Sequence, residues 1–124
     1  MKKIQRTERG WAGHFCGAKN CLFRRNTLLQ CEDQSVVVTT IGSWRPIDEI
    51  LEVGPGRYYE TMVFMAKNYK EADVSKQIYN FTSPWFLKDK CADDKANDMH
   101  ETVVEEISQM MIDNTIHHCL IMEE

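Results

Sequence analysis

The sequence predicts an α+β domain in which an antiparallel β-sheet is followed by a long amphipathic C-terminal helix. Three observations predict this class: runs of β-branched and aromatic residues, turn residues between them, and one segment with helical periodicity near the C-terminus. With 124 residues, 43% hydrophobic and 27% charged, the chain is long enough for one core and too short for two. We therefore expect a single domain over residues 1–124.

The first elements are a glycine-rich segment and a hairpin. Residues 10–17 contain three glycines among aromatic residues, a pattern typical of a loop or a kinked strand. Residues 20–30 mix apolar and basic side chains, and residues 36–41 are all β-branched, so both segments are expected to be strands. The polar connector at residues 32–34 has hairpin length, which favours an antiparallel pair.

The middle of the chain contains a turn followed by two further strands. After an irregular stretch that begins at residues 44–46, the Gly-Pro-Gly at residues 54–56 predicts a turn. Residues 57–66 then alternate with largely apolar side chains on both faces, so this strand should be covered on two sides, within one chain or by a neighbouring subunit. Residues 74–81 form a weaker predicted strand, which ends at the Thr-Ser-Pro of residues 82–84.

The C-terminal helix is expected to begin at Asp93, because acidic residues suit a helix N-terminus. It should run to about Asn114, and residues 115–122 would extend it or form one more short strand. Its acidic residues are expected on a solvated face. The predicted buried face consists of apolar residues spaced three or four apart: Ala96, Met99, Val103, Ile107 and Met110.

Charge and hydropathy exclude several classes of protein. A net charge of -4 argues against a protein that binds duplex nucleic acid by neutralising phosphates, although a small anionic ligand needs only a local pocket. No apolar run reaches the roughly 18 residues of a membrane span. The first six residues are not followed by the apolar run of a signal peptide, which predicts an intracellular protein.

The cysteines and histidines predict neither a disulfide framework nor a metal site. Five cysteines at irregular spacing are typical of reduced, mostly buried thiols. The nearest approach to zinc ligands is Cys16 and Cys21 with His14, and it lacks paired spacing. The histidines are scattered and expected at the surface. We therefore predict no metal and no cofactor, whereas a nucleophilic Cys–His pair stays open because such pairs meet in space.

Two mixed constellations suggest nucleotide binding. The first consists of residues 57–59, 79–81 and 85–86, followed by Asn97 and His100 on the helix; aromatic rings stack on bases, and arginine or amide donors contact phosphates and base edges. Lys95 and Asn97 also place a donor and an amide beside the free N–H groups of the helix start. Aromatic residues at strand spacing also suit a core, and the helix start also suits a plain cap.

The second constellation is Arg24, Arg25 and Asn26 beside Phe23. Adjacent arginines on a strand point to opposite faces. At most one of them therefore serves a given pocket, unless subunits share it.

Five segments, which together cover most of the chain in order, resemble the phage Thoeris anti-defence sponge family, the first type described. They are RGWAGHFC at residues 9–16, CLFRRNTL at 21–28, RYYETMVF at 57–64, DVSKQIY at 73–79 and ADDKANDMHE at 92–101. The resemblance implies a phage-encoded protein in the cytoplasm of an infected bacterium. Such proteins sequester glycocyclic ADP-ribose, the signal made by TIR-domain proteins of the Thoeris system, without cleaving it.

The resemblance also implies an assembly and sites. The family forms dimers that build into hexamers, with the glycocyclic ADP-ribose pocket at a subunit interface and, in some members, a separate site for the cyclic trinucleotides of CBASS defence. For this chain it assigns the second site, on a three-fold axis, to Arg24, Arg25 and Asn26. The residues that it assigns to the first pocket are Arg57, Tyr59, Phe81, Trp85, Lys95 and Asn97.

Residues 80–91 diverge from the family, so either Phe81, Trp85 or Phe86 is the residue that stacks on the base. Two other functions stay open. One is a small nucleotide-processing enzyme that uses His100 or a helix carboxylate as general base. The other is a protein-interaction module that inhibits a bacterial enzyme through its aromatic strand.

Overall fold

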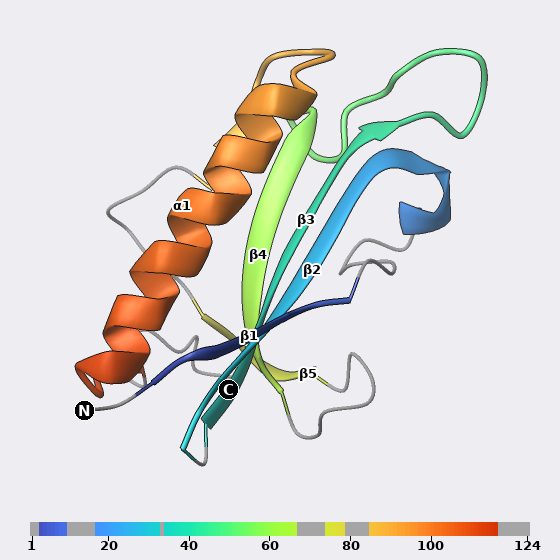
Figure 1. The fold of residues 1–124 in the computed structure, drawn as a ribbon. Coiled ribbons are helices and arrows are strands. Elements are labelled where there is room, and N and C mark those ends of the chain that lie inside the picture. The colour runs from blue at the N-terminus through green and yellow to red at the C-terminus, as the bar shows by residue number, and fades with distance from the viewer. Residues whose placement is uncertain (1–2, 10–16, 33, 67–73, 79–84, 117–124) are drawn as a thin grey trace.

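A computed structural model describes residues 3–9, 17–32, 34–66, 74–78 and 85–116. The described part of the chain contains six strands, one short 3₁₀ helix and one α-helix (Figure 1). Their bounds are β1 Gln5–Glu8, η1 Ala18–Asn20, β2 Cys21–Cys31, β3 Gln34–Trp44, β4 Tyr59–Ala66, β5 Val74–Ile78, β6 Phe86–Leu87 and α1 Asp93–Ile112.

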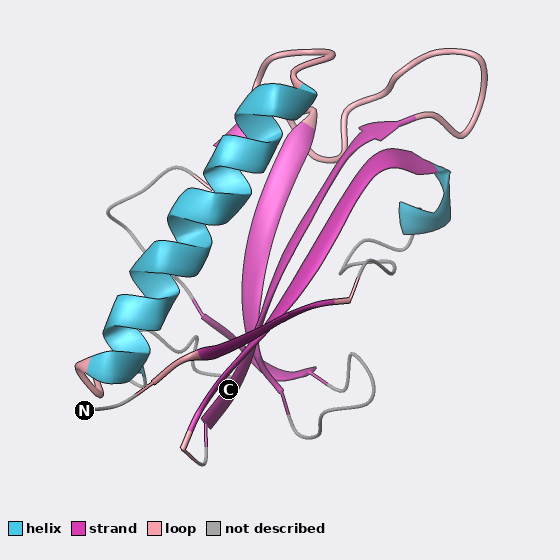
Figure 2. Ribbon diagram, in the orientation of Figure 1, coloured by secondary structure: helices cyan, strands magenta, loops and turns pink. Residues whose placement is uncertain are grey.

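The strands form one antiparallel sheet in the order β1-β2-β3-β4-β5, and β6 pairs with the first residues of β4. Helix α1 lies along one face of this sheet, so that the described elements form a helical layer against a β layer (Figures 1 and 2). The predicted α+β class is therefore confirmed. The helix is not long and apolar enough to cross a membrane, and it is the only long helix among the described residues.

The predicted hairpin is the centre of the sheet. Strands β2 and β3 pair over their whole length, from Cys31 opposite Gln34 to Cys21 opposite Trp44. Strand β2 lies one residue later than predicted, and β3 extends beyond the predicted residues 36–41 at both ends. Glu32 has a positive φ of 57°, which lets the chain reverse between the strands. Gln34, expected in the connector, is already the first residue of β3.

The core lies between α1 and the face of the sheet that it covers. Because side chains alternate along strands, Leu29, Val36 and Val63 lie on that face and pack against Ile107 and Met111. The helical stripe continues from Ile107 to Met111, which is fully buried, whereas the predicted Met110 is only half-buried.

Helix α1 ends close to the predicted residue. Asn114 has a positive φ of 58°, its N–H donates to the Met111 carbonyl, and the Thr115 N–H donates to the Met110 carbonyl. This Schellman motif satisfies carbonyls of the last turn.

The opposite face of the sheet is also largely covered within one chain. Leu28, Val37 and Ile41, which alternate away from α1, are buried. On β4 the residues facing the helix, including Thr61 and Val63, are buried, and their neighbours Met62 and Phe64 are half-buried. The two-sided cover expected for this strand is thus confirmed on the helix side and partial on the other.

Three short elements escaped the sequence analysis: β1, η1 and β6. Strand β1 is four residues long, and all four are exposed, so no apolar alternation marks it. Strand β6 has only two residues. Strand β5 covers Val74–Ile78 of the predicted residues 74–81, and residues 79–81 lie outside the described residues.

Candidate functional site

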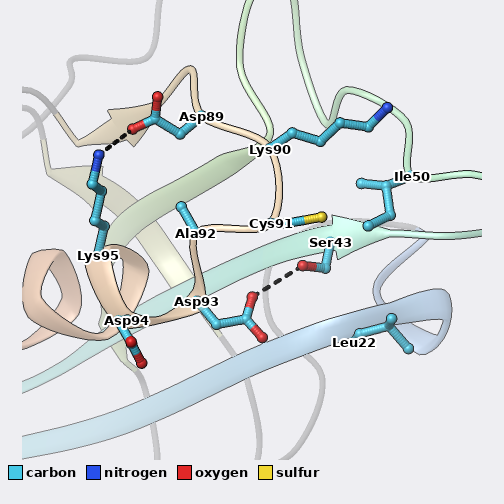
Figure 3. Close-up of a pocket in the computed structure, with 10 residues that line it drawn as sticks. All are labelled: Leu22, Ser43, Ile50, Asp89, Lys90, Cys91, Ala92, Asp93, Asp94 and Lys95. Atoms are coloured by element: carbon cyan, nitrogen blue, oxygen red, sulfur yellow. Dashed lines mark hydrogen bonds and ion pairs between the residues drawn. The ribbon is translucent and has the colours of Figure 1, made fainter.

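A cavity lies at the start of α1 (Figure 3). Its volume is about 710 Å³, within the roughly 300–1,000 Å³ typical of small-molecule sites. The loop between β6 and α1 forms one wall, and residues from the start of β2, the end of β3 and the following segment form the other. The lining residues are Leu22, Ser43, Ile50, Asp89, Lys90, Cys91, Ala92, Asp93, Asp94 and Lys95.

The wall beside the helix is held by the hydroxyl of Tyr59, which lies beneath the cavity and is fully buried. This hydroxyl donates to the Asp93 Oδ1 at 2.6 Å and accepts from the Ala92 N–H at 2.7 Å. The Ser43 hydroxyl lies 2.9 Å from it and 3.1 Å from the same Asp93 oxygen. Burial, and then the hydrogen bond to Asp93, raise the pKa of Tyr59, so it stays a proton donor at neutral pH.

Both signs of charge meet in the cavity. Lys95 pairs with Asp89 at 2.9 Å, and the Lys90 ammonium lies 5.8 Å from the centre of the Tyr58 ring. The first turn of α1 has no side-chain cap at Ala92, so backbone N–H groups of that turn are available to a ligand oxygen. Three carboxylates outnumber two ammonium groups, so the lining suits a ligand with both phosphates and hydroxyls better than a bare phosphate.

A second cluster joins β1, β2 and α1 through ion pairs. The Glu101 carboxylate accepts hydrogen bonds from both terminal nitrogens of Arg6. It also accepts one from the Nη1 of Arg25 at 2.7 Å. These bonds, led by that from Arg6, lower the pKa of Glu101 to about 2. Glu8 accepts from Arg25 and Thr27; burial alone would raise its pKa, but these bonds lower it.

His100 lies beneath this cluster and is fully buried, which corrects the expectation of a surface histidine. Its Nε2 is 2.7 Å from the Thr27 hydroxyl, and its Nδ1 is 2.6 Å from the Thr40 hydroxyl, which in turn is 2.6 Å from the Thr61 hydroxyl. Burial, followed by the charge of Arg25, lowers the pKa of His100 to about 4, so the ring is neutral at pH 7.

The carboxylate of Glu8 fixes the direction of this hydrogen-bond chain. An ionised carboxylate only accepts, so the Thr27 proton goes to Glu8 and the Thr27 oxygen must accept from His100 Nε2–H. The Nδ1 is then the acceptor for the Thr40 hydroxyl. Both ring nitrogens are engaged, so His100 has no nitrogen to offer as a general base in this conformation.

Of the six residues predicted for the first pocket, the five that the structure describes do not converge within one chain. Lys95 lines the cavity, and Tyr59 supports it from the core. Asn97 is exposed, accepts from Arg25 at 3.0 Å and is not one of the residues that line the cavity.

The aromatic candidates lie elsewhere. Arg57 pairs with Glu60 at 3.1 Å and lies 5.9 Å from the centre of the Phe86 ring. Trp85 is half-buried against the main core cluster, whereas Phe86 is more exposed. Phe81 lies outside the described residues.

The three residues predicted for a second site also separate. Arg25 points to α1, whereas Arg24 and Asn26 alternate to the opposite face, as strand geometry predicted. Arg24 is exposed, and Asn26 is fully buried, where its Oδ1 accepts from the Nε of Arg9 at 2.8 Å. Arg25 and Asn97, assigned to different sites, contact each other directly.

Local sequence patterns indicate only part of this cavity. Ser43 and Lys90 belong to no motif, and nothing in the sequence shows that Tyr59 would support the helix start from the core instead of contacting a ligand. The acidic start of the helix was the one local pattern that pointed to this end of the molecule.

The cysteines, the candidate metal ligands and a second cavity give no further candidate site. Cys21 and Cys31 are buried, and burial raises the pKa of Cys21 to about 11, which makes it a poor nucleophile. Cys16 and His14 lie outside the described residues. Within the described ranges, no group of three His, Cys, Asp or Glu side chains is placed to hold a metal ion. A smaller cavity of about 490 Å³ between β1 and α1 contains none of the predicted site residues.

Comparisons with known proteins found no relative of this chain. No family model matches the chain, and searches of curated proteins and of solved structures find no match.

Proposed function

We propose that this protein binds and sequesters glycocyclic ADP-ribose in the cytoplasm of an infected bacterium, and so prevents activation of a Thoeris effector. The observation that carries the proposal is the cavity at the start of α1, which has the volume of a nucleotide-sized site and a mixed lining of ammonium groups, carboxylates and backbone N–H groups. The family resemblance of the five sequence segments names the ligand.

The lining suits the parts of such a ligand. The pyrophosphate lies against Lys90, Lys95 and the N–H groups of the first helical turn, where ammonium charge and the helix dipole favour an anion. The ribose hydroxyls face Asp93, because the second oxygen of its carboxylate makes no hydrogen bond to the described residues. A phosphate placed on the carboxylates instead would be repelled.

Sequestration fits the chemistry around the cavity better than catalysis does. A general base needs a free acceptor beside the ligand, and His100 is buried with both nitrogens engaged. The carboxylate of Glu101 is held by two arginines, which lower its pKa to about 2, so it too is a poor proton acceptor at neutral pH. We therefore propose a binding protein.

We further propose that the protein works as a homo-oligomer, a dimer that builds into a hexamer, in which a neighbouring copy completes the pocket. Leu22 lines the cavity and is 66% exposed, so one apolar wall faces solvent in a single chain. A second copy would cover it and supply aromatic residues for stacking on the base. Any cyclic trinucleotide would lie at a separate site around the exposed Arg24.

The test is to mix purified protein with glycocyclic ADP-ribose, remove unbound small molecules, denature the protein by heat and identify the released compound by chromatography. Intact ligand at a fixed ratio to protein is expected. A processed product would instead indicate an enzyme. No retained nucleotide, together with a stable complex with a bacterial protein, would indicate the interaction module.

A matched set of lysine variants tests the cavity. The double variant Lys90→Gln, Lys95→Gln should weaken binding at least about tenfold, because each change removes an ammonium group from the lining. Lys88→Gln is the control, since Lys88 is exposed in the same loop and does not line the cavity. Equal affinity in the double variant and the control would remove the cavity from the proposal.

A further inference from the structure

We propose that Tyr59 is the positioning residue of the cavity at the start of α1, and that it acts without touching the ligand. This inference rests on the proposed function for its ligand, but its geometry stands independently. Three of the residues that line the cavity, Ser43, Ala92 and Asp93, are the hydrogen-bond partners of the Tyr59 hydroxyl. Tyr59 itself is fully buried and does not line the cavity.

The three partners come from separate parts of the chain. Ser43 lies near the end of β3, Tyr59 opens β4, and Ala92 and Asp93 open α1. One hydroxyl therefore ties the end of the sheet to the first turn of the helix. It also accepts from the N–H of Ala92, the N-cap residue, which has no partner within the helix.

The aromatic ring of Tyr59 is fixed as firmly as its hydroxyl. The ring lies over Gly42, its partner on β3, where a Cβ atom would come within 2.0 Å of the Tyr59 Cδ2. Phe23 meets the ring edge-on with centroids 5.9 Å apart. Because Gly42 and Phe23 pack against the ring, the sheet positions the hydroxyl, and it thereby sets where the Asp93 carboxylate faces the cavity.

The test is Tyr59→Phe, which keeps the ring and removes only the oxygen. The amides of residues 88–94 should exchange hydrogen at least about tenfold faster, because Ala92 and Asp93 lose their shared partner, whereas those of residues 103–107 in the middle of α1 should be unchanged. Affinity for glycocyclic ADP-ribose should fall about tenfold through faster dissociation, because the wall is no longer preorganised.

Tyr58→Phe is the matched control, with the same chemical change at the adjacent residue. Tyr58 is half-buried outside the cavity lining, and its ring contact with Lys90 does not need the hydroxyl. It should leave both exchange and affinity unchanged.

Two outcomes would overturn the proposal. In one, the Tyr59→Phe protein has wild-type exchange at residues 88–94. In the other, exchange rises equally throughout α1, which would make the role of Tyr59 one of general stability. If the wild-type protein retains no nucleotide while residues 88–94 still loosen selectively, the proposed function fails and the positioning role stands.

Discussion

At the scale of single residues, the contact between Gly42 and Tyr59 determines how closely the sheet and the start of α1 approach. Gly42→Ala should destabilise the protein by about 2–3 kcal/mol, because the added Cβ would overlap the buried Tyr59 ring and force it out of its packed position. Urea unfolding measures the change. Binding of nucleotide should weaken as well, since a displaced ring carries the Tyr59 hydroxyl away from Asp93.

Gly56→Ala provides the contrasting control for this prediction. Gly56 has a φ of 71° and open space where a Cβ would lie, so an alanine there would make no clash. Its left-handed backbone conformation alone should lower the unfolding free energy by about 1 kcal/mol. The two glycines thus serve different purposes, one steric and one conformational. A Gly42→Ala protein as stable as the Gly56→Ala protein would show that the ring over Gly42 can move aside.

At the scale of elements, β1 depends on polar contacts. Its four residues are exposed, and it is held by pairing with β2 and by Arg6, whose guanidinium grips Glu101 on α1. The strand therefore adds little apolar burial of its own. Its attachment to the helix should be the most salt-sensitive contact in the described part of the fold.

Arg6→Gln tests this attachment. We expect a loss of about 0.5–1 kcal/mol in unfolding free energy, small because both side chains are more than a third exposed and water screens their charges. Amide exchange at residues 5–8 should rise more than elsewhere. Glu101→Gln should cost more, since Arg25 loses a partner too. Lys3→Gln, a nearby exposed control, should change neither quantity; an equal effect of Lys3→Gln would mean that net charge is responsible.

Elements with a strong local pattern were predictable from sequence, and contacts between elements were not. The β-branched run of β3 and the spacing of Ala96, Met99, Val103 and Ile107 identify the central strand and the helix with bounds close to those found. Strand β1 carries no such pattern, because its contacts lie with partners about 20 and 95 residues away along the chain.

The candidate site shows the same division. The helix start was predicted as a binding feature, and Lys95 does line the cavity. The role of Tyr59 was not predictable, since it depends on Ser43 and Asp93, which the fold brings to it. His100 was expected at the surface because nothing local reveals that Thr27 and Thr40 would supply partners to a buried ring.

At the scale of the whole molecule, His100 couples the packing of α1 on the sheet to pH. The hydrogen-bond chain runs from Thr61 on β4 through Thr40, His100 and Thr27 to Glu8 on β1, so it links the helix to four strands. Arg25, Arg6, Glu8 and Glu101 are the charged groups around it. Protonating the ring would place a buried charge beside Arg25 and would reverse the Nδ1 from acceptor to donor, opposite a hydroxyl that donates to it.

The consequence is a loss of stability in mild acid. The pKa of His100 falls from its ordinary 6.5 to about 4 in the fold, so the unfolded chain binds more protons between these values, and stability must decrease as pH falls from 6.5 towards 4. The full effect is about 3 kcal/mol, since each unit of pKa is worth about 1.4 kcal/mol. The carboxylate of Glu101 affects stability only at lower pH. Its pKa is about 2 in the fold, so its contribution to the unfolding free energy is lost only below its ordinary pKa of 4.5.

Urea unfolding from pH 7 to pH 4.5 in wild type, His100→Gln and Glu101→Gln separates these groups. Glutamine can accept from Thr40 and donate to Thr27 but does not titrate, so His100→Gln should be less stable at pH 7 and lose little more as pH falls. Glu101→Gln should keep the wild-type slope above pH 4.5. If His100→Gln keeps the wild-type slope instead, the acid sensitivity comes from histidines outside the described residues, and the buried ring is not the group that couples the helix to pH.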